Sequence, residues 1–408
     1  MFAKKGEATM EKKISILFAI YYLGSGGAEK ALINLLDMID YERYEVDLLL
    51  FEKKGLYLPQ LNKNVNLLPV IPEFDKIRRV KGYCKWAVTH GKFISAVKRV
   101  NYVLKEKKGI NMNQKTWDLC WTHFLPPLPK EYDVAVGYMQ GIPNWYVASK
   151  VKAKYKIGWV HNDYAKMTYD KNFDIQFFKR LDRIVSVSEQ CTNSLKQYFP
   201  SLTNRIKTLL NLMSPGMIRT KALDPKESYP DDYNLPRLLT IGGLRKQKGF
   251  DMAIQACSRL KMKGFKFIWY VIGIGELRDK LDKMVEEYGV GDCFIFLGER
   301  SNPYPYINQA DIYVQPSYFE GKSIAIDEAK ILYKPIVVTK FPSVYDQIVD
   351  EKTGILVDID PECIAGGIER LLVNDKLRKY LTSNLMEEQY DLEDEELERH
   401  YQLFERTL

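Results

Sequence analysis

The chain has 408 residues, of which 46% are hydrophobic and 28% are charged, and its formal net charge is +7. This composition is ordinary for a folded globular protein and excludes extensive disorder. No apolar run approaches the ~20 residues that cross a bilayer, so we expect that this chain is not an integral membrane protein. The length exceeds what a single hydrophobic core usually organises, so two domains are expected.

The six cysteines are scattered along the chain. They show neither the paired spacing of a disulfide framework nor the short Cys/His intervals of a zinc site. A reducing cytosol fits this pattern best, so we expect a cytoplasmic protein. The cysteines are Cys84, Cys120, Cys191, Cys257, Cys293 and Cys363.

The first expected strand, within residues 14–23, leads into a glycine-rich turn at residues 24–29 and then into a helix with apolar residues at helical spacing. A strand, a glycine turn and a helix in this order begin a nucleotide-binding type of fold. The same apolar run follows two lysines and so imitates a signal peptide, but the periodic helix after it favours a buried strand. The sequence does not decide whether Met1 or Met10 is the native start.

Further short apolar runs, with helical stretches between most of them, indicate that the first half of the chain is an α/β sheet. We expect strands at residues 46–51, 134–136, 157–160, 184–187 and 206–210.

A basic helical region is inserted into this half, around residues 76–108. It carries eleven basic residues against the single acid Glu106, interleaved with four aromatic residues. Such a segment is typical of an amphipathic helix on anionic lipid, and equally of a solvated helix face. Nucleic acid fits less well, because no recognition motif accompanies the charges. The candidate acceptor or membrane residues are Arg78, Arg79, Lys81, Lys85 and Trp86.

Between Thr220 and Pro236 the sequence turns to Pro, Asp, Lys and Tyr with little periodicity, which indicates an interdomain linker. Helical segments separate the short apolar runs of the second half, so this half should be a parallel, doubly wound sheet. Its expected strands are residues 238–241, 267–272, 293–296, 312–314, 336–338 and 354–357.

We therefore expect three parts. Residues 1–222 form an N-terminal Rossmann-like domain with the basic insertion, and residues 235–385 form a C-terminal Rossmann-like domain. An acidic C-terminal helix at residues 386–408 packs back towards the N-terminal domain. Two such domains face each other across a cleft, which is the default place for a ligand.

The most informative stretch is residues 317–329, where two carboxylates flank a tight turn and a helix start. Glu320 follows the carboxyl end of a strand, where open α/β sheets place ligands, and Gly321 permits the turn. Ser323 is a natural N-cap for a helix whose N-terminal amides favour a phosphate. Glu328 lies on the apolar face of that helix, where a carboxylate is costly unless donors such as ligand hydroxyls surround it. The alternative is a boundary glutamate and a second one that reaches water.

Three other groups of residues are candidates for the same cleft. After the first strand of the second half, Arg245 and Lys248 can neutralise a diphosphate without a metal ion. Gly273 follows another strand of that half and can approach the base or the ribose. His161 closes a strand of the first half. Each group also has an ordinary structural interpretation, as a loop, a turn or a structural histidine.

The triplet Asp358-Ile359-Asp360 imitates the Asp-x-Asp metal ligands found in some sugar-transferring enzymes. It lies after the last expected strand, beside Pro361 and distant in sequence from every other candidate. We interpret it as a loop and expect no metal site and no cofactor.

Together these features resemble the retaining glycosyltransferases of family 4, which have the two-domain GT-B architecture. The ordered series of motifs makes a chance match implausible, and it is most specific from Gly242 to Asp358. In the second half the motifs are Lys248-Gly249, Gly273-Ile274-Gly275, Leu297-Gly298, Ala310-Asp311, Pro316-Ser317, Glu320-Gly321, Glu328, Lys334-Pro335-Ile336-Val337 and Thr353-Gly354. In the first half they are Gly26-Gly27-Ala28-Glu29, His161 and Ser186-Val187-Ser188-Glu189.

The resemblance implies a role for each site residue. Glu328 holds the ribose hydroxyls, Glu320 contacts the donor sugar near the scissile bond, and His161 touches the transferred sugar. Lys248 with an arginine holds the diphosphate, and Gly26 and Gly27 form the donor-facing loop. The amides after Glu320 cap the diphosphate from the helix N-terminus; they belong to Gly321, Lys322, Ser323 and Ile324.

The chain departs from the family pattern at one position. The family usually has an arginine directly after the glycine of the first strand of the second half, where this chain has Gly243. Arg245 is the candidate substitute.

Our first hypothesis is a cytoplasmic enzyme, for which peripheral attachment to the inner face of the cell membrane is an open option. It transfers a hexose or N-acetylhexosamine from a nucleotide diphosphate sugar, with UDP as the family's commonest usage, to a glycan or lipid-linked glycan for a cell-surface polysaccharide. The first alternative is a non-catalytic GT-B partner subunit that binds a sugar nucleotide. The second is a GT-B sugar-nucleotide epimerase, which releases a free altered sugar. The sequence does not indicate the donor sugar, the linkage or the oligomeric state.

Overall fold

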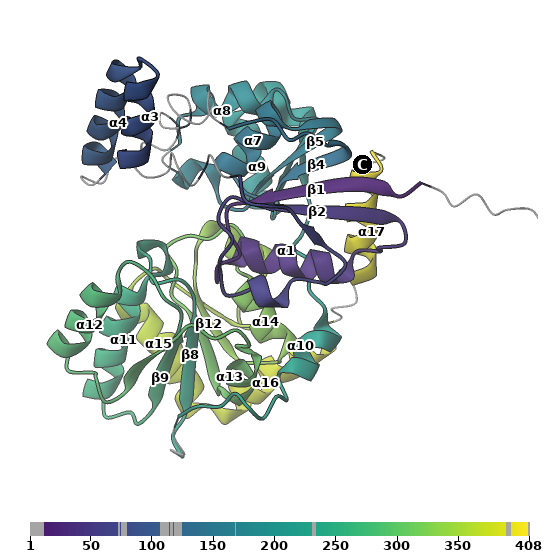
Figure 1. Ribbon diagram of the computed structural model, residues 1–408. Coiled ribbons are helices and arrows are strands. Elements are labelled where there is room, and N and C mark those ends of the chain that lie inside the picture. Colours follow the sequence, from purple (N-terminus) through teal and green to yellow (C-terminus); the bar gives the residue numbers. More distant parts are fainter. Residues whose placement is uncertain are drawn as a thin grey trace, which may run out of the picture.

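The computed structural model describes residues 12–71, 74, 80–106, 114, 117, 125–167, 169–230, 234–388 and 393–406. Over these residues the chain forms two α/β domains, one above the other in Figure 1. Each domain is built on a parallel sheet with helices on its faces, as the alternation of apolar runs and helical stretches predicts.

The N-terminal domain contains a seven-stranded sheet in the order β3-β2-β1-β4-β5-β6-β7, and every neighbouring pair is parallel. The apolar run that imitates a signal peptide forms β1, a buried strand inside this sheet. The short edge strand β3 was not predicted, because two residues give no periodic signal. The strands are β1 (Ile14–Ile20), β2 (Tyr44–Leu50), β3 (Asn66–Leu67), β4 (Glu131–Gly137), β5 (Lys152–Val160), β6 (Arg183–Ser186) and β7 (Ile206–Thr208).

Helices cover both faces of this sheet. On one face, α1 (Gly27–Met38) buries Leu32 and Leu35 against the sheet. On the other face, α7 (Ile142–Lys150) buries Trp145 and Tyr146. The remaining helices of the sheet are α8 (Lys171–Phe178) and α9 (Glu189–Tyr198).

The basic segment forms two helices, α3 (Val80–Thr89) and α4 (Phe93–Glu106), which pair as a hairpin that projects from the N-terminal domain (Figure 1). The predicted basic helical region is therefore helical, and it consists of two helices. The break falls at Gly91, whose φ of 69° lies in the left-handed region that favours glycine. Arg78 and Arg79 lie outside the described residues.

The C-terminal domain contains a six-stranded parallel sheet in the order β10-β9-β8-β11-β12-β13. The strand order reverses between β8 and β11, so the carboxyl ends of these two strands border the crevice in which doubly wound sheets bind ligands. The strands are β8 (Arg237–Ile241), β9 (Ile268–Ile272), β10 (Phe294–Gly298), β11 (Ile312–Gln315), β12 (Ile336–Thr339) and β13 (Ile355–Val357).

The helices of the C-terminal half pack around this sheet, and α10 precedes it at the junction between the domains (Figure 1). They are α10 (Pro215–Lys221), α11 (Phe250–Met262), α12 (Arg278–Glu287), α13 (Tyr304–Gln309), α14 (Ile324–Ile331), α15 (Pro361–Val373) and α16 (Asp375–Glu387).

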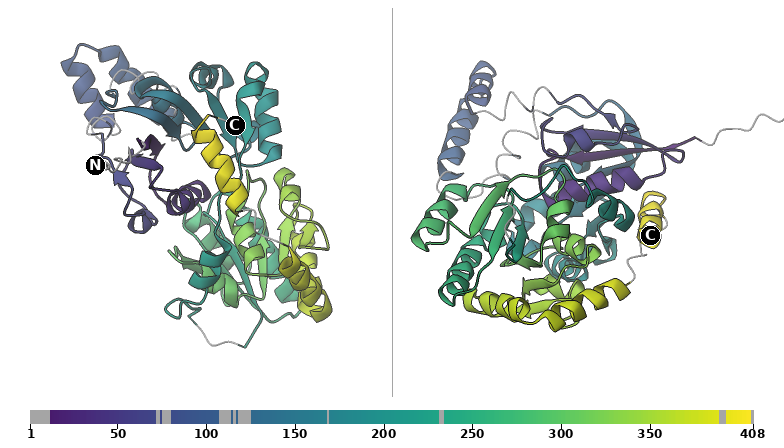
Figure 2. Two further views of the ribbon diagram at one scale, coloured as in Figure 1. Left: turned by 90° about the vertical axis from the view of Figure 1, so that its right-hand side faces the viewer. Right: turned by 90° about the horizontal axis from the view of Figure 1, so that it is seen from below.

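The last helix, α17 (Glu393–Phe404), returns to the N-terminal domain (Figure 2). Phe404 packs edge-on against Phe18 of β1, and the carboxylate of Glu396 accepts a hydrogen bond of 2.7 Å from the amide of Leu210. The chain therefore crosses between the domains twice, and its end is fixed by packing on the first domain.

His400 of α17 is buried against Trp159 of β5, with the two rings stacked 6.0 Å apart. Its Nδ1 atom is 2.7 Å from the carbonyl oxygen of Glu396, to which it donates. Burial lowers the pKa of His400 from 6.5 to about 4. The folded protein therefore holds this imidazole in its neutral form at neutral pH.

This depressed pKa predicts a loss of stability in acid. Below pH 6.5 the unfolded chain binds a proton that folded His400 does not bind until about pH 4, so the free energy of unfolding falls across that window by up to ~1.4 kcal/mol per pH unit. In H400Q the amide keeps a donor for Glu396 but does not titrate. Between pH 7 and 5.5, urea unfolding should show that the wild type loses about 1 kcal/mol more than H400Q. Parallel pH profiles of the two proteins would contradict the assignment.

Candidate active site

A cavity of about 720 Å³ lies between the two domains. Its walls are the segments that follow the carboxyl ends of strands in both sheets, as the parallel topology predicts. The N-terminal domain contributes residues 24–30 after β1, 139–143 after β4 and 161–162 after β5. The C-terminal domain contributes residues 242–243, 245 and 247–248 after β8, 273–275 after β9 and 320–325 after β11.

Glu320 is buried at the end of β11 and is held by side chains of its own domain. Lys248 Nζ lies 2.6 Å from Oε1, and the Ser317 hydroxyl donates to the same oxygen at 2.7 Å. Gln247 Nε2 donates to Oε2 at 3.2 Å, and Gln315 Nε2 lies 3.3 Å from Oε1. The structure thus presents Glu320 as a carboxylate in one fixed orientation, with Lys248 directed at it.

Glu328 is buried on α14, and its partner comes from the opposite domain. Lys30 of α1 forms an ion pair with Glu328, and its Nζ lies 4.4 Å from the centre of the Tyr304 ring. Because both side chains are buried, each charge depends on the other for compensation.

Sequence reasoning identified Glu328 but missed Lys30. The signal that singled out Glu328, a charged residue in an otherwise apolar helix, is also present in α1, where Lys30 precedes a run of buried residues. The pairing itself could not be predicted, because it depends on how two separately folded domains dock.

The Glu328 charge also acts on the phenols around it. Burial first, and then the neighbouring carboxylate, raise the pKa of Tyr304 well above 10, and they raise the pKa of Tyr57 in the same direction. Both tyrosines therefore remain neutral hydrogen-bonding groups beside the ion pair.

Gly321 brings the Glu320 loop against the N-terminal domain. A Cβ atom at this position would overlap the carbonyl oxygen of His161, so only glycine fits. The Gly321 carbonyl accepts a hydrogen bond of 3.0 Å from the Ser188 hydroxyl. The predicted proximity of Glu320 and His161, which lie on different domains, is therefore visible in the backbone contact between Gly321 and His161.

His161 is buried at the end of β5 with a defined tautomer. Its Nε2 atom lies 3.1 Å from the carbonyl oxygen of Tyr138 and must donate the proton, because a carbonyl only accepts. Burial lowers the pKa of His161 to about 4, so the imidazole is neutral and Nδ1 keeps its lone pair. This ring can accept a hydrogen bond from a hydroxyl but carries no charge at neutral pH.

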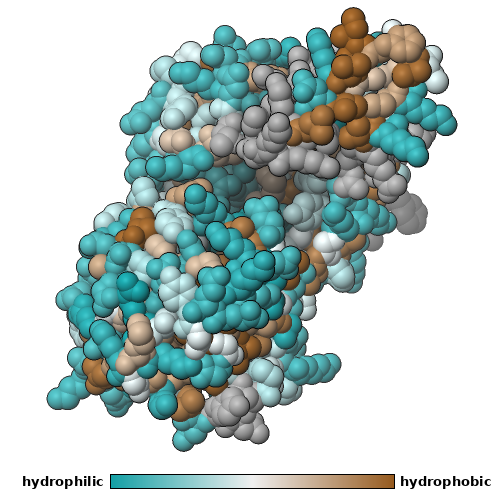
Figure 3. Space-filling model, turned by 90° about the vertical axis from the view of Figure 1, so that its left-hand side faces the viewer, coloured by the Kyte–Doolittle hydropathy of each residue, from teal (hydrophilic) through white to brown (hydrophobic). Residues whose placement is uncertain are grey.

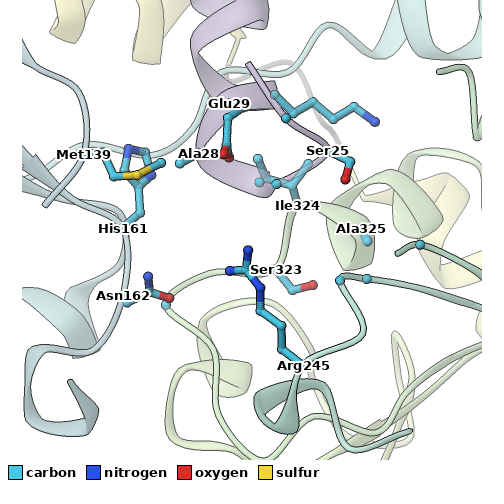
Figure 4. A pocket seen from close by; sticks show the side chains of 18 of the residues that line it. Ser25, Ala28, Glu29, Met139, His161, Asn162, Arg245, Ser323, Ile324 and Ala325 are labelled. Carbon is cyan, nitrogen blue, oxygen red and sulfur yellow. The ribbon is translucent and has the colours of Figure 1, made fainter. Parts of the chain in front are cut away.

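Arg245 extends from the C-terminal domain into the cavity, with Glu29 of α1 on the opposite side (Figure 4). Burial raises the pKa of Glu29, and the Arg245 charge opposes that shift. Within the described part of the chain, Arg245 forms no ion pair, whereas Lys248 is occupied by Glu320.

The N-terminus of α14 borders the cavity beside Arg245. The Ser323 hydroxyl is buried, and no described protein group is its hydrogen-bond partner. Gln347 fixes the backbone here, because its side chain bonds both the amide and the carbonyl of Ser323, at 3.0 and 2.8 Å. Lys322 pairs with Asp327 at 3.6 Å, and Ile324 lines the cavity.

The glycine turns after β8 and β9 pack against each other in the cavity wall. A Cβ atom on Gly273, whose φ is 150°, would overlap the carbonyl oxygen of Gly242. Gly26 and Gly27 line the opposite wall, where Gly26 is the N-cap of α1. Backbone therefore forms much of the cavity surface, and a ligand can approach it closely.

Two groups of predicted residues lie elsewhere. Lys81, Lys85 and Trp86 are on α3 and do not line the cavity. Asp358 pairs with Lys340 at 2.9 Å and Asp360 caps α15, in keeping with their interpretation as a loop. In the part of the chain that the structure describes, no cluster of three or more His, Cys, Asp or Glu side chains could hold a metal ion.

The family match of this chain lies in its C-terminal half. Residues 225–387 match the family model described as glycosyl transferases group 1. Over 368 residues, 88% of this chain and 90% of the relative, the chain is 26% identical to a protein of Campylobacter jejuni. That protein is named N-acetylgalactosamine-N,N'-diacetylbacillosaminyl-diphospho-undecaprenol 4-alpha-N-acetylgalactosaminyltransferase. Over 178 residues, 43% of this chain and 50% of the relative, this chain is also 30% identical to the lipopolysaccharide core biosynthesis glycosyltransferase LpsE of Rhizobium meliloti.

Among solved structures, HepE of Anabaena in complex with UDP-glucose superposes with a TM-score of 0.67 at 15% identity, covering 97% of this chain and 99% of the other. A likeness at this identity shows the fold. Together with the family match, it confirms the GT-B architecture and the resemblance to family 4 that the sequence motifs predict.

The buried interdomain ion pair gives a test of the site's construction. Lys30→Met leaves Glu328 buried without a partner, so we expect a loss of about 3 kcal/mol in the free energy of unfolding or of domain docking. The double variant K30M/E328Q should recover much of that loss, because no charge is then left buried. Chemical denaturation measures both.

The matched control is Lys263, whose pair with Glu369 lies at the surface. K263M should change stability by no more than ~0.5 kcal/mol. Equal effects of K30M and K263M would show that the Lys30 pair is not a buried interdomain contact.

Proposed function

We propose that this chain, whose residues 225–387 form a group 1 glycosyltransferase domain within a GT-B fold, is a retaining glycosyltransferase of cell-surface polysaccharide biosynthesis. It transfers a hexose or N-acetylhexosamine from a nucleotide diphosphate sugar, of which UDP-sugars are the first candidates, to a glycan or lipid-linked glycan. The observation that carries the proposal is the convergence of Glu320, Glu328, Arg245 and His161 on one cavity between the domains.

Glu328 supplies the ribose site in this proposal. An ionised carboxylate has about four acceptor positions, and Lys30 occupies one oxygen. The remaining positions can accept hydrogen bonds from the vicinal ribose hydroxyls. The ion pair with Lys30 holds the carboxylate in one orientation, which suits it to this task.

The diphosphate site is assigned to Arg245 and the N-terminus of α14. Arg245 has no carboxylate partner in the described chain and extends into the cavity, so its charge is available to a ligand. The first amides of α14 and the Ser323 hydroxyl provide donors beside it. These groups stabilise the negative charge that develops on the leaving diphosphate, and the proposal requires no metal ion.

The transfer proceeds on one face of the donor sugar. The bond from the anomeric carbon to the phosphate oxygen breaks, and a bond to the acceptor oxygen forms on the same face. The acceptor's proton passes to the departing phosphate oxygen, so no separate base is needed. Glu320, fixed by Lys248 and Ser317, places a negative charge beside the sugar, and neutral His161 accepts from a sugar hydroxyl through Nδ1.

The acceptor half of the proposal rests on the relatives. The name of the Campylobacter protein includes a diphospho-undecaprenol-linked sugar, and that of the Rhizobium protein refers to lipopolysaccharide core. None of the described helices is long and apolar enough to cross a membrane. For lipid-linked acceptors of this kind, we place the enzyme in the cytoplasm, peripheral on the inner face of the membrane.

Product analysis tests the reaction. Sugar nucleotides are first screened for thermal stabilisation, since a ligand at 100 times its dissociation constant adds about 2.7 kcal/mol to folding stability. With the best donor and a diphosphate-linked acceptor, mass spectrometry should detect an acceptor heavier by one sugar. Release of a free altered sugar would identify an epimerase, and binding without turnover would identify a partner subunit.

Glu320→Gln separates chemistry from binding in this assay. The amide keeps the volume of the side chain but removes its negative charge, so we expect kcat to fall ~100-fold or more. Affinity for the nucleoside diphosphate should change by less than ~3-fold, because the proposal gives Glu320 no contact with that part of the donor. A fall in affinity that matches the fall in rate would move Glu320 to the nucleotide site.

Arg245→Ala tests the substitute for the missing family arginine. Removing a charge-assisted contact to a diphosphate should weaken donor binding ~10-fold or more, measured by calorimetry. Lys246 is the matched control, because it is also exposed and basic but lies outside the cavity lining. Equal donor affinities of R245A, K246A and the wild type would remove Arg245 from the site.

A further inference from the structure

The outer face of α4 carries a row of large apolar side chains that are open to solvent. Their spacing of four, three and four residues along the helix aligns Phe93, Val97, Val100 and Leu104 on one face, and Ile94 widens the row. Figure 3 shows this row as the hydrophobic area at the upper right. We call these five residues the α4 stripe. Scattered apolar residues are normal on a protein surface, but a contiguous row marks an interaction site.

The stripe does not contribute to the fold of the hairpin. A different side of α4 buries Ala96 and Arg99, and α3 buries Tyr83 and Ala87 towards the domain core. Because α4 already has an inward face, the stripe is a second apolar face that the described N-terminal domain does not cover.

The hairpin that carries the stripe is basic. Lys98 lies beside Ile94 on the helix surface, and Lys81, Lys85 and Lys92 are also exposed on the hairpin. From Val80 to Lys105 the sequence contains no acidic residue. An apolar row on a basic hairpin segment without acidic residues is the pattern of a helix that lies in the interface of an anionic bilayer.

The charge distribution decides among the possible occupants. A second copy of this chain would bring lysines against lysines around the stripe, which opposes association. The 14 residues of α4 extend ~21 Å, less than the ~30 Å hydrocarbon core, so the helix can lie on a bilayer but not span it.

We propose that the α3–α4 hairpin is the membrane-contact element of this protein. The α4 stripe inserts among the acyl chains of an anionic bilayer, and the flanking lysines contact the lipid phosphates. This deepens the proposed function and rests on it only for the lipid-linked acceptor. The lysines of α3, which the sequence indicates as the candidate contact, are secondary to the apolar residues of α4.

Vesicle flotation with a double substitution tests the proposal. Ile94 and Val97 are 74% and 70% exposed, so I94D/V97D should fold normally. The matched control is M262D/V373D, because Met262 and Val373 are 77% and 68% exposed on the other domain. Vesicles are phosphatidylcholine alone or with about one third phosphatidylglycerol. We expect the wild type and M262D/V373D to float with the anionic vesicles and I94D/V97D to partition at least ~10-fold less.

Each other outcome has a definite meaning. Equal flotation of wild type and I94D/V97D, or no flotation of the wild type, overturns the proposal. Sedimentation without lipid detects the remaining rival: a wild-type dimer that I94D/V97D dissociates would assign the stripe to a second copy.

A transfer assay with a water-soluble diphosphate-linked acceptor keeps this proposal separate from the proposed function. I94D/V97D should keep wild-type transfer in that assay while it loses flotation. If the wild type floats with the anionic vesicles but transfers no sugar, the result contradicts the proposed function and supports the membrane contact.

Discussion

The structure depends on how two buried carboxylates of the C-terminal domain obtain their cations. A buried charge is tolerated only when it is paired. Glu320 finds Lys248 within its own domain, whereas Glu328 is compensated by Lys30 from the other domain. One of the two acidic positions is thus complete only when the domains are docked. The backbones of Gly321 and His161 also meet only when the domains are docked, and they approach so closely that no space is left for a Cβ atom on Gly321. Docking of the domains and assembly of the cavity are therefore one event.

The local parts of this site could be predicted from the sequence, and the contacts between them could not. Glycine turns at strand ends, a carboxylate on an apolar helical face and a histidine at the end of a strand are visible in short windows. Because the strands are parallel, the segments that follow them all lie at the carboxyl-end edge of each sheet. The partner of Glu328 comes from α1, far away along the chain, and no local pattern specifies which lysine it is. The division of the basic segment into two helices follows the left-handed φ of Gly91, which the charge pattern of the segment does not reveal.

The sequence also grouped Arg245 and Lys248 by charge, and the structure separates them. Gly249 adopts a φ of 65°, and a Cβ atom there would overlap the carbonyl oxygen of Pro316, so the turn presses against the end of β11. This contact brings Lys248 to Glu320 and leaves Arg245 directed into the cavity. Two basic residues three positions apart thus have different partners because of one backbone conformation. In the proposed reaction, Lys248 orients a carboxylate and Arg245 is the cation that meets the donor.

The α3–α4 hairpin is built in a way that keeps it independent of this cavity. It is inserted between β3, an edge strand, and β4, while β4 pairs with β1 and β5 in the middle of the sheet. The sheet register is therefore set by strands on either side of the insertion, and the cavity walls follow other strand ends. Outward-facing residues of α4 can change without altering the strands that position Glu29, Lys30 or His161. A membrane contact placed on such an insertion would set where the enzyme works, and the docked domains would set what reaction it performs.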